Sequence, residues 1–238
     1  MQVDVYVCRV DADTVDVDHW AADLSETERH RARRFRFDRD RRFFVAAHWV
    51  RRQLLARHAG TRMPALQVDA APGRKPAPLA LPGGGWLHHS LSHAGSWIAL
   101  ALSRAVPVGV DIEPVRELGD PGELDALVRT TFGAAEEQVW HRVERARRHE
   151  AFFVGWTRKE AWVKATGAGL VGIAGTDRGA EVSFDLDDPQ PLRTAQPAAL
   201  QTIRWSGQVL ISAAALQRDV QFRWHTATPA DLAPHPVP

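Results

Sequence analysis

The sequence predicts an α+β fold built from two similar lobes related by a pseudo-twofold axis, and two observations carry this prediction. Each half of the chain begins with a strand, continues with helices and ends with strands. Short segments also recur: Phe43-Phe44-Val45 returns as Phe152-Phe153-Val154, and Ala59-Gly60 returns at the same offset as Ala168-Gly169. We therefore expect the two long helices to match in length without a gap, and a functional site to lie between the lobes.

In the first half, local patterns predict each element. Apolar and polar residues alternate from Val3 to Val10, which predicts a strand. Ser25 with Glu28 three positions later is typical of a capped helix start. The other expected elements are a helix over 40–58 that ends at Gly60, a Pro/Gly-rich loop over 72–85, and two strands over 87–102 with a turn at Ala94-Gly95-Ser96.

The second half repeats this order. We expect a strand over 106–113, helical stretches over 124–148 and 150–166, and strands near 182–186 and 209–216. A turn at Ser206-Gly207-Gln208 parallels the earlier one. The predicted division is therefore an N-terminal lobe over 1–105, a C-terminal lobe over 106–225, and an unstructured, proline-rich tail over 226–238.

Composition places the 238-residue chain among soluble globular proteins, with 45% hydrophobic and 25% charged residues. No apolar run approaches the roughly 18–20 residues that a membrane helix needs, and the N-terminus lacks the basic and apolar segments of a signal peptide. Cys8 is the only cysteine, so an intrachain disulfide is excluded. Together these features favour a cytoplasmic protein without a membrane partner.

Charge is unevenly distributed although the net charge is only +1. Eight arginines fall within residues 29–42, whereas the segment over 111–125 is acidic. A basic patch beside carboxylates suggests a polyanionic ligand. The low net charge argues against a nucleic-acid partner, and a solvated helix face is an equally good interpretation of the arginines alone.

Asp111 and Glu113 are the first candidate site residues. They are two positions apart on the expected strand, so both carboxylates point to one face while Val110 and Ile112 point to the other. Two neighbouring carboxylates are costly unless a cation joins them, and oxygen ligands favour Mg²⁺ or Mn²⁺ over zinc. The alternative is a solvated strand edge.

A second candidate group lies on the helix over 150–166. Glu160 and Lys164 are four residues apart and therefore neighbours on one helix face, with Trp156 one turn earlier. The alternative here is an ordinary exposed ion pair, which stabilises a protein by only a few tenths of a kcal/mol.

The segment His88-His89-Ser90-Leu91-Ser92-His93 allows three interpretations. A zinc site could use His88 and His93, and a hydrolase could use Ser92 with a histidine. Neither is favoured, because the chain has no HExxH helix, no CxxC pair and no GxSxG elbow. We favour a strand-end turn that presents Ser92 and His93 to a phosphate.

Taken together, these segments resemble the paired signature of the 4'-phosphopantetheinyl transferase superfamily. The resemblance rests on Gly109-Val110-Asp111-Ile112-Glu113 and, after a spacing of about 45 residues, on Trp156-Thr157-Arg158-Lys159-Glu160-Ala161 with Lys164. Further matches identify the larger, two-lobed, Sfp-like branch, and these are Arg33-Arg34-Phe35, Lys75-Pro76 and Leu91-Ser92-His93. The similar region spans about residues 20 to 170.

The resemblance implies a role for each matching position. Asp111, Glu113 and Glu160 match magnesium ligands (Mn²⁺ is an alternative metal), and Glu160 and Lys164 are the expected catalytic residues. Glu160 is also the expected base toward an acceptor serine. Glu136 matches an acidic position near the metal, and Glu28 stands where some relatives have a lysine. The residues expected to bind coenzyme A are Arg29, Arg31, Lys75, Ser92, His93, Lys159 and Lys164.

The implied function is transfer of the phosphopantetheine arm of coenzyme A to a serine of a carrier protein or carrier domain. The implied enzyme acts as a cytoplasmic monomer, because the interface between two lobes is internal. Two alternatives remain at this point. One is a transferase restricted to the fatty-acid carrier protein, and the other is a basic, non-enzymatic binding module with a decayed site.

Overall fold

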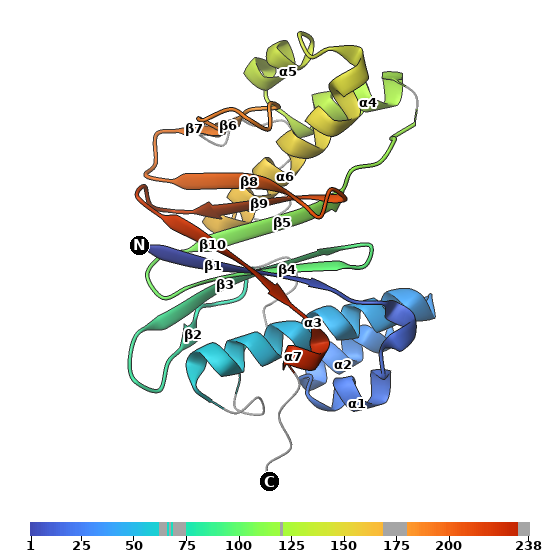
Figure 1. Ribbon diagram of the computed structural model, residues 1–238, viewed down its shortest axis with the longest axis vertical. Coiled ribbons are helices and arrows are strands. Elements are labelled where there is room, and N and C mark those ends of the chain that lie inside the picture. Colours follow the sequence, from blue (N-terminus) through green and yellow to red (C-terminus); the bar gives the residue numbers. More distant parts are fainter. Residues whose placement is uncertain (62–65, 67, 69–74, 120, 169–179, 233–238) are drawn as a thin grey trace.

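The computed structural model describes residues 1–61, 66, 68, 75–119, 121–168 and 180–232. Two β-sheets lie at the centre of the molecule, one group of helices covers the outer face of each sheet, and the expected α+β class is confirmed (Figure 1). Within these ranges, no helix combines the length and the apolar character that crossing a membrane requires.

The N-terminal part builds a five-stranded sheet in the order β10-β1-β4-β3-β2. Its central motif starts with β1, continues with the long helix α3 and returns through the hairpin β3-β4. The bounds are β1 (Gln2–Arg9), α3 (Asp38–Ala59), β2 (Leu79–Ala80), β3 (Trp86–Ala94), β4 (Trp97–Ser103) and β10 (Gln221–Ala227).

The C-terminal part repeats that motif as a three-stranded sheet in the order β5-β9-β8. Its strands follow the antiparallel order of β1-β4-β3, and its long helix α6 occupies the place of α3 in the chain. The hairpin turns also match, because Gly95 and Gly207 both adopt positive φ angles, of 57° and 65°. The bounds are β5 (Val108–Pro114), α6 (Arg148–Thr166), β8 (Ala199–Trp205) and β9 (Val209–Ala215).

Shorter elements complete the fold. In the N-terminal part, Ser25 caps α2 and exchanges hydrogen bonds with Glu28, which confirms the expected capping box. In the C-terminal part, the single expected helical stretch over 124–148 is interrupted at Gly133 and forms three pieces. The remaining bounds are η1 (Ala12–Thr14), α1 (Val17–Ala22), α2 (Glu26–Arg33), α4 (Pro121–Thr131), α5 (Ala134–Trp140), η3 (Arg145–Arg147), β6 (Ala180–Val182), β7 (Leu192–Thr194) and α7 (Pro229–Leu232).

Three apolar layers hold these elements together. One lies between α3 and the five-stranded sheet, and another lies between α6 with α4 and the three-stranded sheet. The middle layer joins the two sheets and includes Val5 of β1, Val110 and Ile112 of β5, and Ile211 of β9. Because this layer is continuous, β5 is held against β3 and β4, and the edge between the two sheets can carry a site.

The lengths of the two long helices, α3 and α6, differ from the expectation. Helix α3 has 22 residues and α6 has 19, so the two helices do not match without a gap. Gly60 ends α3 in the left-handed conformation as expected, and α6 ends at Thr166 as expected, but its left-handed residue is Gly167. Gly167 has a φ of 75°, which glycine adopts without steric cost. The expected repeat at Gly169 lies outside the described residues.

The expectation of an unstructured tail is wrong for residues 226–232. Residues 226 and 227 complete β10, and 229–232 form α7. The physical reason is burial: Leu232 is 2% exposed in the core beneath α3, and Arg57 Nη2 donates a 2.7 Å hydrogen bond to the Asp231 carbonyl. The predicted end of the C-terminal lobe at residue 225 falls inside β10. This strand pairs in parallel with β1 and so belongs to the N-terminal sheet. Residues 233–238 are not described.

Candidate active site

The site begins with Asp111 on β5. As alternation predicts, Val110 and Ile112 enter the layer between the sheets, whereas Asp111 turns to the opposite face, toward α6 and β3. The alternative of a solvated strand edge is therefore excluded for Asp111, which is only 4% exposed. Glu113 lies further along the same face and is half-buried, with Arg116 Nη1 at 3.3 Å from its carboxylate.

Gly109 brings α6 close enough to complete the site. A methyl group at this position would overlap the carbonyl oxygen of Ala161 and lie 2.5 Å from the amide nitrogen of Ala165. Only a residue without a side chain allows this approach of helix backbone to strand backbone. As a result, Glu160 and Lys164, which flank this contact along α6, stand beside Asp111.

A compact polar cluster forms at this contact. Lys164 Nζ lies 2.7 Å from Asp111 Oδ1 and 3.1 Å from Ser92 Oγ, and Ser92 Oγ donates a 2.8 Å hydrogen bond to the same Asp111 oxygen. Glu160 Oε2 lies 4.0 Å from Lys164 Nζ. Residues from β3, β5 and α6 therefore meet where the two sheets join, and the Glu160–Lys164 pair is not an ordinary surface pair.

Two buried carboxylate oxygens in this cluster have no hydrogen-bond partner among the described residues: Asp111 Oδ2 and Glu160 Oε1. Burial raises the pKa of Glu160 to about 7, and the charges of Asp111 and Glu113 act in the same direction. The pKa of Glu113 is raised by burial and by Asp111 as well. Unsatisfied, mutually repelling carboxylates are the donor set that a divalent cation stabilises.

The oxygens fit a hard cation, but they are not yet arranged around one. Among the residues that the structure describes, no three Asp, Glu, His or Cys side chains already converge closely enough to hold a metal. The two free oxygens of Asp111 and Glu160 supply a two-residue core, and Glu113 is the third carboxylate near it. Its Oε2 lies 3.3 Å from Arg116 Nη1.

The other residues of Trp156–Ala161 anchor α6 rather than enter the site. Thr157 Oγ1 lies 2.9 Å from Ser212 Oγ of β9, and the guanidinium of Arg158 donates to the carbonyls of Ser183 and Asp185 at 2.8 Å. Arg158 is 1% exposed, and burial lowers its pKa to about 10. These contacts fix the rotation of α6, so that Glu160 faces Asp111.

Lys159 does not reach the site, which corrects the expectation that it binds coenzyme A. Its ammonium lies 2.6 and 2.8 Å from the two carboxylate oxygens of Glu136, and both side chains are buried. Glu136 also accepts hydrogen bonds from the amides of Gly133 and Val182. With both oxygens occupied, Glu136 is not an acidic group near the metal position, and that expectation is corrected too.

Glu136→Gln tests this assignment. The change removes the ion pair but leaves a carbonyl acceptor, so we expect the free energy of unfolding to fall by about 1–3 kcal/mol. Denaturant titration would measure this loss of stability. In steady-state kinetics, turnover per folded molecule and the Michaelis constant for coenzyme A should change less than about twofold. A selective rise in that Michaelis constant would return Glu136 and Lys159 to the site.

The two candidate arginines of α2 point in different directions. The Arg31 guanidinium lies 5.3 Å from the centre of the Phe44 ring of α3. Arg29 instead donates to the Leu24 carbonyl at 2.5 Å and lines a pocket on the outer side. Residues two apart on a helix face different ways, so the expectation that both Arg29 and Arg31 bind coenzyme A is corrected for Arg29.

Glu28 has a structural role that explains its presence. It is buried and accepts from Arg52 Nε at 2.6 Å and pairs with Arg51 and His48 of α3. Burial alone would raise the pKa of Glu28, but the His48 hydrogen bond and the Arg51 charge outweigh it and hold that pKa below its usual range. Glu28 with Arg52 is thus the N-terminal counterpart of Glu136 with Lys159.

Lys75 and His93 lie at the two ends of the site. Lys75 Nζ donates 2.9 Å hydrogen bonds to the carbonyls of Val108 and Ala165 and so connects the start of β5 to the end of α6. Burial lowers its pKa to about 8. His93 follows Ser92 on β3, and its exposed ring meets Phe43 edge-on at 5.4 Å. No zinc or hydrolase arrangement forms around Ser92 in the described residues.

Sequence reasoning missed the residues that support the site. Ser90 Oγ accepts a 3.1 Å hydrogen bond from the Val110 amide and so joins the two lobes. Gly109, Thr157 and Arg158 were used only as parts of a motif. The signal that could have identified Gly109 is its position: a glycine inside a strand often marks a close backbone approach.

The fold and the cluster define a two-lobed α+β protein in which buried carboxylates and a lysine gather where the lobes join. Comparison with known proteins agrees. A family profile described as the 4'-phosphopantetheinyl transferase superfamily matches residues 107–219. The chain is 29% identical over 175 residues to 4'-phosphopantetheinyl transferase HetI of Nostoc sp., covering 74% of this chain and 71% of that protein.

A second relative is 4'-phosphopantetheinyl transferase psf-1 of Bacillus pumilus, 30% identical over 148 residues, which are 62% of this chain and 59% of psf-1. A crystal structure of a holo-(acyl-carrier-protein) synthase from Bacillus anthracis in complex with CoA (3',5'-ADP) aligns with 48% of this chain and 97% of its own, at 23% identity and a TM-score of 0.36. These matches support placement of the chain in the 4'-phosphopantetheinyl transferase superfamily, in its Sfp-like branch.

Proposed function

We propose that this protein transfers the 4'-phosphopantetheine arm of coenzyme A to a serine of a carrier protein and releases adenosine 3',5'-bisphosphate. One observation carries the proposal beyond family membership. Asp111 and Glu160 each keep a buried carboxylate oxygen without a partner, directly beside the Lys164 ammonium. This combination of two open acids and one cation suits a pyrophosphate that is bound together with a metal ion.

Asp111, Glu160 and, after rotation, Glu113 are the proposed ligands of Mg²⁺, with Mn²⁺ as the alternative. When bound, the ion would supply positive charge to the pyrophosphate oxygens. The proposal rests on the two unpartnered oxygens and on the oxygen-only donor set, which suits a hard cation.

The chain's own residues perform the remaining tasks. Lys164 is partly exposed and is proposed to move from Asp111 to the pyrophosphate, where it stabilises the charge that develops on the departing phosphate. Glu160 accepts the proton of the acceptor serine hydroxyl, and its raised pKa, about 7, matches that task near neutral pH. Ser92 orients Asp111 by donating to Oδ1 and remains within reach of a ligand phosphate.

The adenosine end of coenzyme A is proposed to lie along β3 and α2. Arg31, over the Phe44 ring, and His93, against the Phe43 ring, are the proposed contacts of the 3'-phosphate. Lys75 has three N–H donors and two carbonyl partners among the described residues, which leaves one donor for a phosphate. Arg29 and Lys159 are removed from this set.

Arg31→Ala tests the 3'-phosphate contact. A charge-assisted hydrogen bond is worth about 1.5–3 kcal/mol, so we expect the Michaelis constant for coenzyme A to rise about tenfold or more. The constant for 3'-dephospho-coenzyme A should hardly change, because that substrate lacks the group. Arg29→Ala, on the outer side of α2, should alter neither constant. Equal weakening toward both substrates would place Arg31 elsewhere.

The acceptor is proposed to be an apo carrier protein or carrier domain, and the enzyme is proposed to act as a monomer in the cytoplasm. Incubation with coenzyme A, Mg²⁺ and an apo carrier protein should add about 340 Da to the carrier, as mass spectrometry would detect. A panel that includes peptidyl and fatty-acid carriers separates a broad transferase from a restricted one. If a folded, magnesium-loaded protein modifies no carrier in the panel, the proposed function is wrong.

A further inference from the structure

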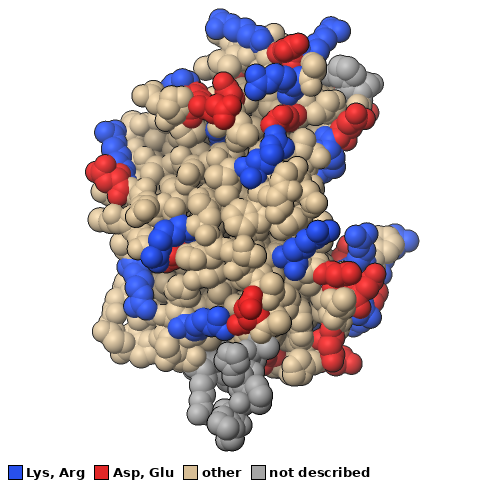
Figure 2. Space-filling model, in the orientation of Figure 1, with Lys and Arg blue, Asp and Glu red and all other residues tan. Residues whose placement is uncertain are grey.

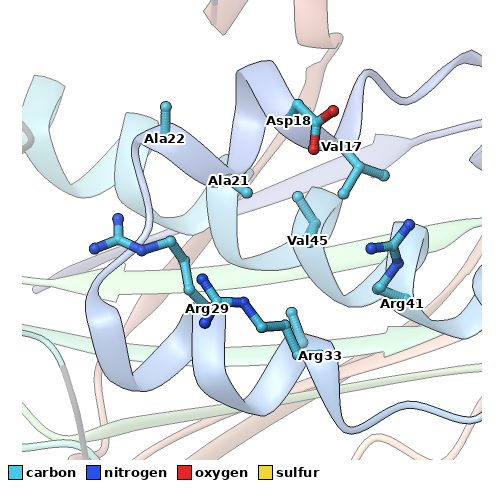
Figure 3. A pocket seen from close by; sticks show the side chains of 9 residues that line it. Val17, Asp18, Ala21, Ala22, Arg29, Arg33, Arg41 and Val45 are labelled. Atoms are coloured by element: carbon cyan, nitrogen blue, oxygen red, sulfur yellow. The ribbon is translucent and has the colours of Figure 1, made fainter.

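A second pocket lies on the outer side of the N-terminal lobe, where α1, α2 and the first turns of α3 meet (Figure 3). Its volume is about 270 Å³. Charged side chains form its rim and small apolar side chains form its floor. The lining residues are Val17, Asp18, Ala21, Ala22, Arg29, Ala32, Arg33, Arg41 and Val45.

This pocket is distinct from the candidate active site. Arg31, whose guanidinium lies over the Phe44 ring, does not line the pocket, whereas Arg29 and Arg33 do. None of the side chains around Asp111, Glu160 and Lys164 lines it. The proposed transfer reaction therefore leaves the pocket without a role.

The charges in the pocket do not balance. Three guanidinium groups and one carboxylate line it, which gives a net charge of +2. Arg41 is paired with Asp38 at 2.8 Å, and Arg29 uses one N–H for the Leu24 carbonyl at 2.5 Å. Arg33 is exposed and has no hydrogen-bond or ion-pair partner among the described residues, so its guanidinium is open to a ligand.

The arrangement of these groups indicates what kind of ligand fits. Arg29 and Arg33 lie at one end of the pocket, with Asp18 and Arg41 at the other and Ala21 and Val45 between them (Figure 3). Arg29 and Arg41 are oriented by their protein partners before any ligand arrives, which lowers the entropic cost of binding. The carboxylate of Asp18 repels an anion from its own end and directs it toward Arg29 and Arg33.

We propose that this pocket binds a phosphate monoester whose organic part is small and apolar. Guanidinium groups bind phosphate oxygens bidentately, so two of them at one end form a phosphate clamp. The apolar floor of Ala21, Ala32 and Val45 then receives the ester group. A volume of about 270 Å³ holds a phosphate with a few carbon atoms and is below the usual size of a nucleotide pocket.

Ethyl phosphate and inorganic phosphate are suitable probes, titrated at constant ionic strength. Backbone amide chemical shifts of α1 report this pocket alone, because α1 does not touch the candidate active site. We expect saturable shifts, with ethyl phosphate bound more tightly than inorganic phosphate. An absence of saturable shifts in α1, or equal affinity for both probes, would overturn the proposal.

Three exposed positions give variants that should fold. Arg33→Gln should weaken ethyl phosphate binding about tenfold, since it removes the open guanidinium. Asp18→Asn should tighten binding about twofold to fivefold, because it removes the repelling charge. Arg34→Gln, a neighbouring arginine outside the pocket, should have little effect. Equal weakening by Arg33→Gln and Arg34→Gln would reduce the effect to general surface charge and contradict the proposal.

Discussion

Glu160→Gln is expected to reduce turnover by about 10²–10⁴ while the protein stays folded. The amide cannot accept the proton of the acceptor serine, and it is a weaker ligand for Mg²⁺ than a carboxylate. The loss should therefore have two parts: one that high magnesium concentration relieves and one that it does not. Steady-state kinetics with an apo carrier protein at increasing Mg²⁺ would separate the two.

The same change is expected to stabilise the metal-free protein. Burial and two neighbouring carboxylates raise the pKa of Glu160 to about 7 in the folded state, above its ordinary value of 4.5. The unfolded chain therefore releases this proton at a lower pH than the folded one. Wild-type stability is reduced as pH rises from about 4.5 to 7, and the reduction is complete above pH 7. The gain from Glu160→Gln, on the order of 2 kcal/mol, should appear above pH 7 and vanish near pH 4.5.

Glu117→Gln is a matched control, because Glu117 is exposed and takes no part in the cluster. It should change neither turnover nor stability measurably. A Glu160→Gln enzyme that folds and keeps most of its turnover would overturn the assignment of Glu160 as proton acceptor. A loss of stability above pH 7 would show instead that the three carboxylates do not repel one another in the metal-free protein.

Glu160→Gln is expected to lower turnover and to raise the stability of the metal-free protein, and both effects have one cause. Glu160 sits among buried surfaces and carboxylates that disfavour its charged form, and a residue kept there at a cost to stability is typical of a functional site. Lys164 offsets part of that cost in the metal-free protein, since its ammonium lies 2.7 Å from Asp111 Oδ1. The same ammonium is available to a pyrophosphate once a cation replaces it beside the carboxylates.

Most of the site could be predicted from the sequence, because it rests on short-range periodicity. Alternation along β5 places Asp111 opposite Val110, and the four-residue spacing on α6 places Glu160 beside Lys164. Neither pattern needs knowledge of a distant contact. The hairpin β3-β4 was predictable for a similar reason, since its strands are neighbours in the sequence, whereas β8, the first strand of the second hairpin, was not expected.

Three of the errors involve partners that are distant in sequence. Lys159 stands next to Glu160, but one residue along a helix turns the side chain by about 100°, and its partner Glu136 is 23 positions away. β10 pairs with β1 across almost the whole chain, and its alternation of exposed and half-buried residues gives a weak strand signal. The anchoring of α7 beneath α3 depends on Leu232, one apolar residue in a proline-rich segment.

Gly109 shows how a motif residue without chemistry of its own controls the site. Its hydrogen atom faces the backbone of α6, and it is the residue that allows Ala161 and Ala165 to pack directly on β5. In the sequence, Gly109 is a small residue between two valines of an expected strand, and nothing there shows that it contacts a helix. In the structure it sets the distance between the helix that carries Glu160 and Lys164 and the strand that carries Asp111.

Gly109→Ala is therefore expected to reduce both stability and turnover. The added methyl group would overlap the Ala161 carbonyl and crowd the Ala165 amide, and both are backbone atoms that cannot rotate away. Overpacking of this kind costs about 3 kcal/mol or more when backbone must move. A shift of about 1 Å in α6 relative to β5 is enough to lower turnover roughly 10²-fold in the molecules that remain folded.

Gly83→Ala is the matched control, because the same methyl group would meet no atom within 4 Å at that position, where φ is not in the left-handed range. Denaturant titration gives the stability of both variants, and turnover is measured at a temperature where each is folded. Gly83→Ala should match the wild type in both. A Gly109→Ala protein with wild-type stability would show that α6 can move away from β5 freely. Wild-type turnover in a destabilised Gly109→Ala protein would show that the reaction does not depend on the spacing between Asp111 and Glu160, because that spacing is what the methyl group changes.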